Sequence, residues 1–187
     1  MSAFGNSASP AVKVVATGIG AALFFVFGRF VAIPTPVPNT TISIQYALLA
    51  VFALLYGPVV AGLIGFIGHW LIDATTYGPW WSWIIASAVA GLVMGALMVR
   101  AQAGKGRTQM QTLATFNVAA LVACVVSWGV VAPLLDIAIY AEPASKVFTQ
   151  GVVAGVSNAL TTCILGSIIV VAYLRTLTQD ASLRVEE

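Results

Sequence analysis

The only histidine of the chain, His69, lies inside the apolar stretch 57–83, and Asp73 follows it four residues later. On a helix this spacing puts the imidazole and the carboxylate on one face, together with Gly62 and Gly65. Ionisable groups are costly in an apolar segment, and at membrane depth they mark functional sites by default. Such a pair could hold a polar ligand by hydrogen bonds or act as an acid and a base.

Aromatic residues follow this pair in the run Tyr-Gly-Pro-Trp-Trp-Ser-Trp, residues 77–83. Aromatic walls with a few directed hydrogen-bonding groups suit a flat heteroaromatic ligand. Amide side chains from other segments are expected at the same end of the molecule. We therefore predict a pocket for such a ligand lined by Asn39, Gln45, His69, Asp73, Tyr77, Trp80, Trp83 and Asn158.

Each of these features also has a purely structural interpretation. The tryptophans are typical of an aromatic belt at a membrane interface, and the histidine and aspartate can simply hold each other. Asn158 can join two helices. Arg29 and Lys146 fit solvated interface residues, and the proline-rich segment 33–41 fits a plain connector. Only the convergence of all these features at one end of the chain's predicted bundle favours the pocket.

The composition indicates an integral membrane protein with a single domain, 1–187. Of the 187 residues, 60% are hydrophobic and 7% are charged, against about 25% charged in a soluble domain. Cys124 and Cys163 lie in apolar runs and are expected to behave as small hydrophobes, without a disulfide or a metal.

Common catalytic and nucleotide-binding motifs do not occur in the chain. The patterns GxxxxGK[ST], GxSxG and HExxH are missing. One histidine with one aspartate is also a thin set for an enzyme. We therefore expect no catalytic residue, no metal and no cofactor in this chain.

Apolar runs of about 20 residues predict the membrane-crossing segments. The stretch 42–73 is ambiguous, because Gly57-Pro58 interrupts it and makes it either one long kinked helix or two short spans hinged at residues 56–58. Extramembrane loops are expected at 33–41, 75–80, 100–110 and 132–147. The predicted spans are 12–33, two within 42–73, 81–99, 113–131 and 148–174.

The basic residues decide between these two possibilities. The positive-inside rule places basic residues near span ends on the cytoplasmic side. An even number of crossings between Lys13 and Arg100 satisfies it, which favours two short spans within 42–73. The fold class predicted is therefore an all-α bundle of six spans with both termini cytoplasmic and with tails 1–11 and 176–187. The basic residues then on the inside are Lys13, Arg100, Lys105, Arg107, Arg175 and Arg184.

Three segments resemble the substrate-binding S components of energy-coupling factor (ECF) vitamin transporters. They are IGAALFFVFGRF, IPTPVPNT and YGPVVAGLIGFIGHWLIDATTYGPWWSW. The similarity runs over nearly the whole chain and is closest to the hydroxymethylpyrimidine or riboflavin-type branch. It implies a multi-pass protein of a prokaryotic plasma membrane that binds a vitamin or vitamin precursor outside the cell. Hydroxymethylpyrimidine is favoured, and riboflavin and pyridoxine are the other candidates.

The resemblance also implies partners. S components work with a coupling transmembrane subunit and two cytoplasmic ATPase subunits, so ATP is used by the partners, and no nucleic acid is involved. The segment 33–41 would cover the ligand. Small residues four apart on the first span allow close helix contact, and the face implied to meet the coupling subunit is Ala16, Thr17, Gly20 and Ala21. Two alternatives use His69 and Asp73 instead: an intramembrane enzyme and a stand-alone proton-coupled carrier.

Overall fold

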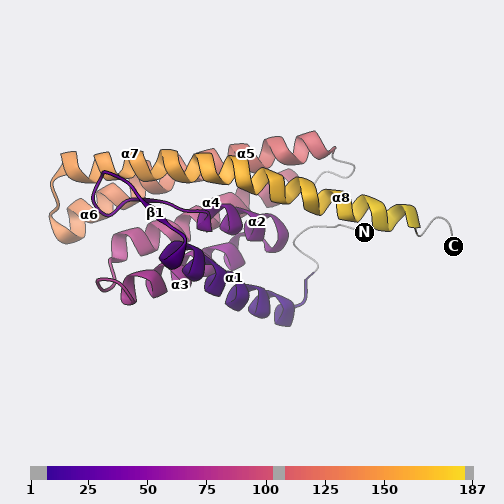
Figure 1. Cartoon of the computed structure of the whole chain (residues 1–187), viewed down its shortest axis with the longest axis horizontal. Coiled ribbons are helices and arrows are strands. Elements are labelled where there is room, and N and C mark those ends of the chain that lie inside the picture. Colours follow the sequence, from indigo (N-terminus) through magenta and orange to yellow (C-terminus); the bar gives the residue numbers. More distant parts are fainter. Residues whose placement is uncertain (1–7, 103–107, 184–187) are drawn as a thin grey trace.

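A computed structural model describes the fold of residues 8–102 and 108–183, with side chains at 8–99 and 108–177. Over these ranges the chain is a bundle of helices with one short hairpin (Figure 1). The elements are α1 (Pro10–Phe30), β1 (Ile33–Pro34), β2 (Thr41–Ile42), α2 (Gln45–Tyr56), α3 (Pro58–Ala74), α4 (Trp81–Gln102), α5 (Gln109–Val126), η1 (Ser127–Val131), α6 (Ala132–Tyr140), α7 (Ala144–Thr161), η2 (Thr162–Gly166) and α8 (Ser167–Leu183).

Four helical runs of the described chain are long and apolar enough to cross a membrane, and two shorter apolar helices lie between them. The long runs are 10–30, 81–99, 109–140 and 144–177, and the short ones are α2 and α3. Large apolar side chains such as Val125, Val152 and Ile168 face outward and are 67%, 62% and 60% exposed. A surface of this kind is suited to lipid, and the predicted all-α membrane bundle is confirmed.

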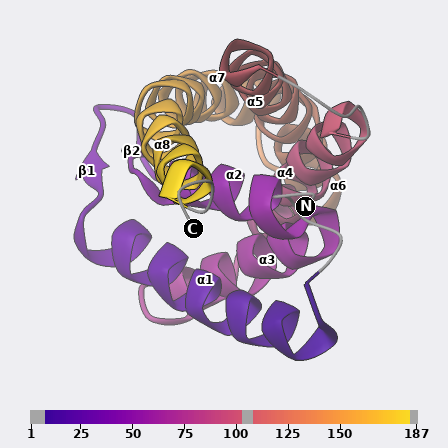
Figure 2. The same cartoon turned by 90° about the vertical axis from the view of Figure 1, so that its right-hand side faces the viewer.

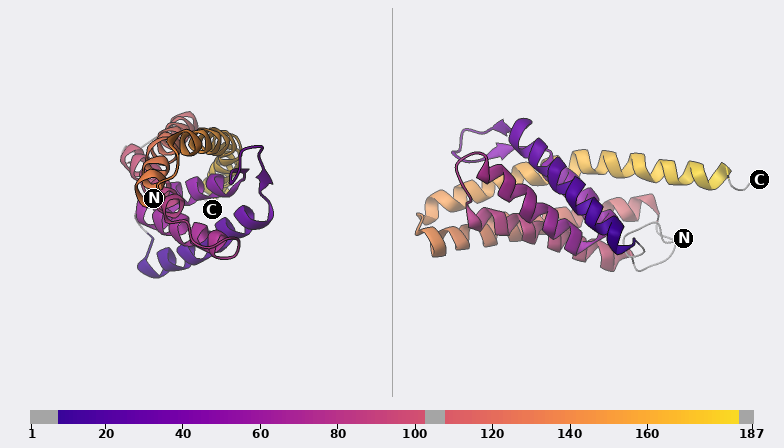
Figure 3. Two further views of the ribbon diagram at one scale, coloured as in Figure 1. Left: turned by 90° about the vertical axis from the view of Figure 1, so that its left-hand side faces the viewer. Right: turned by 90° about the horizontal axis from the view of Figure 1, so that it is seen from below.

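The stretch 42–73 forms two helices, as the distribution of basic residues predicts. Gly57 separates them with φ +85°, a left-handed conformation that side chains larger than hydrogen disfavour. Pro58 then begins α3 at a position where its missing N–H is no loss. The described ends of the chain, the start of α1 and the end of α8, therefore lie at the same end of the bundle (Figures 1 and 3). Which side of the membrane this end faces remains a prediction.

The prediction of a loop at 132–147 is wrong for most of its length. The fifth helix continues through the π-helical turn η1 into α6 and ends only at Tyr140. Pro133 lies two residues after the end of this turn, and a widened turn accommodates the missing N–H of a proline that would otherwise end a helix. Residues 141–143 alone connect α6 to α7, and Ala141 turns the chain there with φ 53°.

The other boundaries differ less. The predicted cytoplasmic tail 176–187 is helical as far as Leu183 because α8 continues past the predicted span. Residues 1–7 and 184–187 of the predicted tails lie outside the described residues, as do 103–107 of the predicted basic loop, which include Lys105 and Arg107. The proline-rich segment forms the antiparallel pair β1–β2, in which Ile33 faces Ile42.

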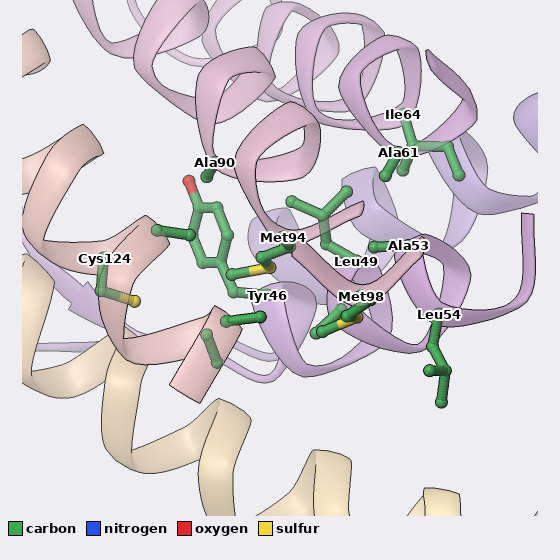
Figure 4. Packing of buried hydrophobic residues seen from close by; sticks show 14 of the residues in the cluster. Tyr46, Leu49, Ala53, Leu54, Ala61, Ile64, Ala90, Met94, Met98 and Cys124 are labelled. Carbon is green, nitrogen blue, oxygen red and sulfur yellow. The ribbon is translucent and has the colours of Figure 1, made fainter. Parts of the chain in front are cut away.

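Small residues bring α3 and α4 together along their length. A Cβ atom on Gly65 would lie 2.4 Å from the Ser87 carbonyl oxygen, and one on Gly91 would lie 2.4 Å from that of Ala61. Around this contact α2 inserts Tyr46 and other core residues, and α4 contributes buried methionines (Figure 4). The end view shows α1 beside α3, on the side of the bundle away from α5 and α7 (Figure 2).

The face of α1 predicted to meet a partner turns inward for three of its residues. Ala16, Gly20 and Ala21 are buried in the chain. A Cβ on Gly20 would lie only 2.3 Å from Ile64 Cδ1 of α3. These residues therefore pack α1 against the rest of the bundle, although Ala16 also lines an outer hollow with Ile19 and Tyr56. Their contact with a partner stays a prediction.

Other small residues of α1 do face outward. Gly18 and Ala22 are exposed, four residues apart, whereas Thr17 is half-buried. A Cβ on Gly18 would meet no atom within 4 Å. Three neighbouring pairs of small residues have the same spacing in the sequence, so spacing alone could not show which pair faces the core.

Replacing Gly91 by alanine tests the α3–α4 contact. The new methyl group would overlap a backbone carbonyl that cannot rotate away, and overpacking of this kind costs about 1–3 kcal/mol. We expect Gly91→Ala to lower the thermal unfolding midpoint in detergent. Gly18→Ala is the matched control and should not lower it, because its methyl group enters open space. Equal midpoints for the two variants would contradict this packing.

Candidate functional site

A cavity of about 550 Å³ opens at the end of the bundle opposite the two described chain ends. It lies between the end of α1, the β1–β2 hairpin, the start of α2, the end of α3, the start of α4, η1, α6 and α7. The structure brings all eight residues predicted from the sequence to this cavity: Asn39, Gln45, His69, Asp73, Tyr77, Trp80, Trp83 and Asn158.

The carboxylate of Asp136 on α6 organises one wall of the cavity. Its Oδ1 accepts a hydrogen bond from Trp80 Nε1 at 2.6 Å, and its Oδ2 accepts one from Trp83 Nε1 at 2.7 Å. The Ser82 hydroxyl donates a third bond to Oδ1. Asp136 is only 2% exposed, and such charge-assisted bonds compensate a buried carboxylate for its lost water.

The two tryptophans held by Asp136 each pack against a second aromatic ring. Trp83 is stacked on Trp128 with 5.4 Å between ring centroids and 24° between ring planes. Trp80 lies against Tyr140 with 4.4 Å between centroids. Each indole therefore has one face covered by protein and its N–H bound to a carboxylate. What remains for the cavity is the other face.

A second polar network begins at the buried carboxylate of Asp73. Its Oδ2 accepts the backbone N–H of Trp80 at 3.0 Å. Its Oδ1 lies 3.5 Å from His69 Nε2 and has no hydrogen bond. That separation is longer than a charge-assisted hydrogen bond, which is about 2.7–2.9 Å. The two residues are thus neighbours with incomplete pairing, and Asp73 keeps an acceptor atom unused.

The far side of the imidazole is fixed by Ser87 of α4. Ser87 Oγ lies 2.5 Å from His69 Nδ1 and 2.8 Å from the hydroxyl of Tyr46. It is also within 3.0 Å of the Trp83 carbonyl oxygen. The Ser87 hydroxyl has a single proton, which it donates to the Trp83 carbonyl oxygen, and the Tyr46 hydroxyl can in turn donate to Ser87 Oγ.

Three charged side chains, Arg29, Glu142 and Lys146, also line the cavity. Lys146 Nζ and Glu142 Oε2 form an ion pair at 2.8 Å, and Arg29 is exposed in the last turn of α1. The pKa of Tyr77 is raised above its ordinary value by partial burial of its hydroxyl and by the neighbouring Asp73 carboxylate. Tyr77 is therefore a neutral phenol that can donate a hydrogen bond at pH 7.

The hairpin is attached across the cavity to α7. Gln150 Nε2 donates to the Pro38 carbonyl oxygen at 2.8 Å. Within the loop, the hydroxyl groups of Thr35 and Thr40 are hydrogen-bonded to each other, and Asn39 has φ 60°.

The described part of the chain has no group of three histidine, cysteine or carboxylate side chains suited to a metal ion.

Sequence reasoning named eight lining residues but missed those that hold them. Asp136 was assigned to an outer loop, although the apolar residues around it are a signal for a helix. Ser87 and Tyr46 had no signal beyond a polar group inside an apolar run, and Trp128 looked like an ordinary core residue. Their roles depend on contacts between segments that lie 23 to 56 positions apart.

The fold and the cavity together describe a multi-pass membrane protein with a cavity at one end of its helices. A family model of the ECF-type riboflavin transporter S component matches residues 10–175. The chain therefore belongs to this family, whose members are transporter components and not enzymes. This confirms the resemblance seen in the sequence at the level of the family, while the branch stays a prediction.

Individual relatives match nearly the whole chain. The chain is 53% identical to a UPF0397 protein of Streptococcus gordonii, covering 92% of each chain. It is 50% identical to the UPF0397 protein EAT1b_2102 of an Exiguobacterium strain, over 93% of this chain and 96% of the relative.

Two solved structures share the fold. A crystal structure of FolT bound with folic acid has a TM-score of 0.60 at 19% identity and covers 85% of this chain and 97% of its own. A structure of the S component of a bacterial ECF transporter has a TM-score of 0.61 at 17% identity, with 92% and 99% covered.

Replacing Ser87 by alanine tests the network around His69. The change removes the Ser87 partner of the Tyr46 hydroxyl and of His69 Nδ1, which keep only their long mutual contact at 3.4 Å, and a buried polar group without a good partner costs about 1–3 kcal/mol. We expect a lower thermal unfolding midpoint than for Ser145→Ala, which removes an exposed hydroxyl at the start of α7. An unchanged midpoint for Ser87→Ala would show that the network adds no stability.

Proposed function

We propose that this protein captures a vitamin or vitamin precursor at the outer face of a prokaryotic plasma membrane for ATP-driven import. The observation that carries the proposal is the cavity of about 550 Å³ at the end opposite the described termini. Its volume lies within the usual range of small-molecule sites, about 300–1,000 Å³. With the termini in the cytoplasm, as the basic residues predict, this cavity opens outside the cell.

Hydroxymethylpyrimidine is the substrate we favour, with riboflavin and pyridoxine as the other candidates. All three contain a flat heteroaromatic ring, and the cavity offers the faces of Trp80 and Trp83 for stacking. Polar contacts would come from His69 and Asp73 on α3 and from Asn158 on α7. A small ring with a few polar substituents could pair each substituent with one of these side chains.

Transport requires partners in this proposal. This chain would bind the substrate, but its sequence contains no nucleotide-binding motif. ATP would therefore be bound by two cytoplasmic ATPase subunits. A coupling transmembrane subunit would connect them to this chain. No nucleic acid takes part. A stand-alone proton-coupled carrier using His69 and Asp73 is the competing proposal, since these two residues are incompletely paired.

Small molecules that co-purify with the protein provide the direct test. The protein is purified in mild detergent, and native mass spectrometry identifies any retained ligand. Uptake of that ligand is then measured in cells with and without the ATPase and coupling subunits. Uptake without them, driven by a proton gradient, would support the carrier instead. The absence of any bound or binding vitamin would overturn the proposed function.

Affinity measurements on cavity variants test the predicted polar contacts. His69→Leu and Asn158→Leu leave polar ligand atoms without partners, which costs about 1–3 kcal/mol, or roughly tenfold to a hundredfold in Kd. Calorimetry with hydroxymethylpyrimidine, riboflavin and pyridoxine measures the effect.

The control for these two variants is Asn117→Leu. Asn117 bonds to Ser167 on α8, away from the cavity, so this variant should lose stability while keeping its affinity. If His69→Leu and Asn158→Leu bind like the parent, these residues only tie helices together.

The exposed small residues of α1 are the surface we propose for the coupling subunit. Gly18→Trp places a large ring where close helix contact would occur and should abolish uptake while leaving the Kd within about twofold. The corresponding change on a different exposed surface, Val125→Trp on α5, should leave uptake intact. Normal uptake by Gly18→Trp would place the partner surface elsewhere.

A further inference from the structure

The tryptophans of the cavity wall have their polar edges turned into the protein. Indole is a donor only, through its single N–H, and in both Trp80 and Trp83 that donor is bound by Asp136 at 2.6 and 2.7 Å. Neither N–H is therefore available to a ligand. The wall can act only through its ring faces.

Asp136 is placed to fix both rings at once. The two indoles belong to neighbouring turns of the chain, at and just before the start of α4, while Asp136 comes from α6, more than fifty positions further on. One carboxylate with two oxygens can bind two N–H groups in defined directions, which sets the orientation of each ring plane. The stacking partners Trp128 and Tyr140 then cover the opposite faces.

The charge on Asp136 also affects the rings electronically. A donor bound to a carboxylate is polarised toward it, so electron density on the indole increases. Electron-rich ring faces attract cations and positively polarised rings. The cavity lining adds to this preference, since it contains the carboxylates of Asp73, Asp136 and Glu142 against the two cations Arg29 and Lys146.

We infer that Asp136 is the positioning residue of the binding site, and that it makes the wall a stacking surface for a flat, electron-poor or positively polarised ring. The inference deepens the proposed function and rests on it for the ligand. The carboxylate itself does not touch the ligand. It acts through Trp80 and Trp83.

Ultraviolet resonance Raman spectroscopy tests the positioning without a ligand. Indole bands report the strength of the N–H hydrogen bond. The five tryptophans contribute together, and Trp128 Nε1 has no partner, so the difference spectrum between parent and variant isolates the strongly bonded N–H groups of Trp80 and Trp83. Asp136→Asn keeps the shape of the side chain but loses its charge and turns one acceptor into a donor, so these bands should shift toward weaker bonding. Asp136→Glu keeps the carboxylate and should restore part of the signal. Unchanged bands in Asp136→Asn would overturn the inference.

A double-mutant cycle tests whether Asp136 acts on binding through the indoles. We expect Asp136→Asn to raise the Kd for hydroxymethylpyrimidine, used as the probe, about tenfold. In a Trp80→Phe/Trp83→Phe background there is no N–H to hold, so the same change should raise the Kd less than about threefold. Equal effects in both backgrounds would overturn the inference. Riboflavin and pyridoxine serve as probes if the pyrimidine does not bind.

The two measurements separate this inference from the proposed function. If the parent protein binds none of the three vitamins but the Raman bands shift as expected, the proposed function fails and the positioning of the rings stands. If a vitamin binds and the bands or the cycle show no role for Asp136, the proposed function stands and the inference fails.

Discussion

The pairing of buried carboxylates is the constraint on which the rest of this structure depends. A charge inside an apolar bundle is costly unless donors surround it. Asp136 meets this requirement with three donors from the segment around the start of α4. The same bonds join α6 to α4 and orient the ring wall. The hydrogen bonds that compensate the buried charge are thus the same bonds that shape the cavity wall.

Asp73 shows the opposite case at the same end of the bundle. It is completely buried, yet one of its oxygens has no hydrogen bond and lies 3.5 Å from the nearest nitrogen of His69. The close approach of α3 and α4 at Gly65 and Gly91 keeps these groups in place. The folded chain therefore keeps a buried acceptor next to the cavity that none of its own donors pairs.

The sequence allowed most of the bundle to be predicted, because hydropathy and basic residues report on the membrane directly. The break at Gly57-Pro58 and the two short helices follow from that reasoning. The run 132–147 was mispredicted because a π-helical turn before Pro133 is a local geometry without a sequence signature. The inward face of α1 was missed for a related reason: Ala16 and Gly20 have the same spacing as Gly18 and Ala22, and only the partner helix distinguishes them.

The cavity residues were predictable where polarity was unusual and unpredictable where contacts cross the fold. His69, Asp73 and the tryptophans are conspicuous in an apolar chain, and they do line one cavity. Asp136 and Ser87 are equally polar, but their importance comes from the atoms that they meet. A carboxylate that binds two indole N–H groups leaves only ring faces for a ligand. His69, Asp73 and Asn158 are among the other polar residues that line the same cavity, and Asp73 is bonded directly to the Trp80 backbone. The ring faces and the polar groups beside them are assembled by contacts across the fold, and no single segment of the sequence contains them.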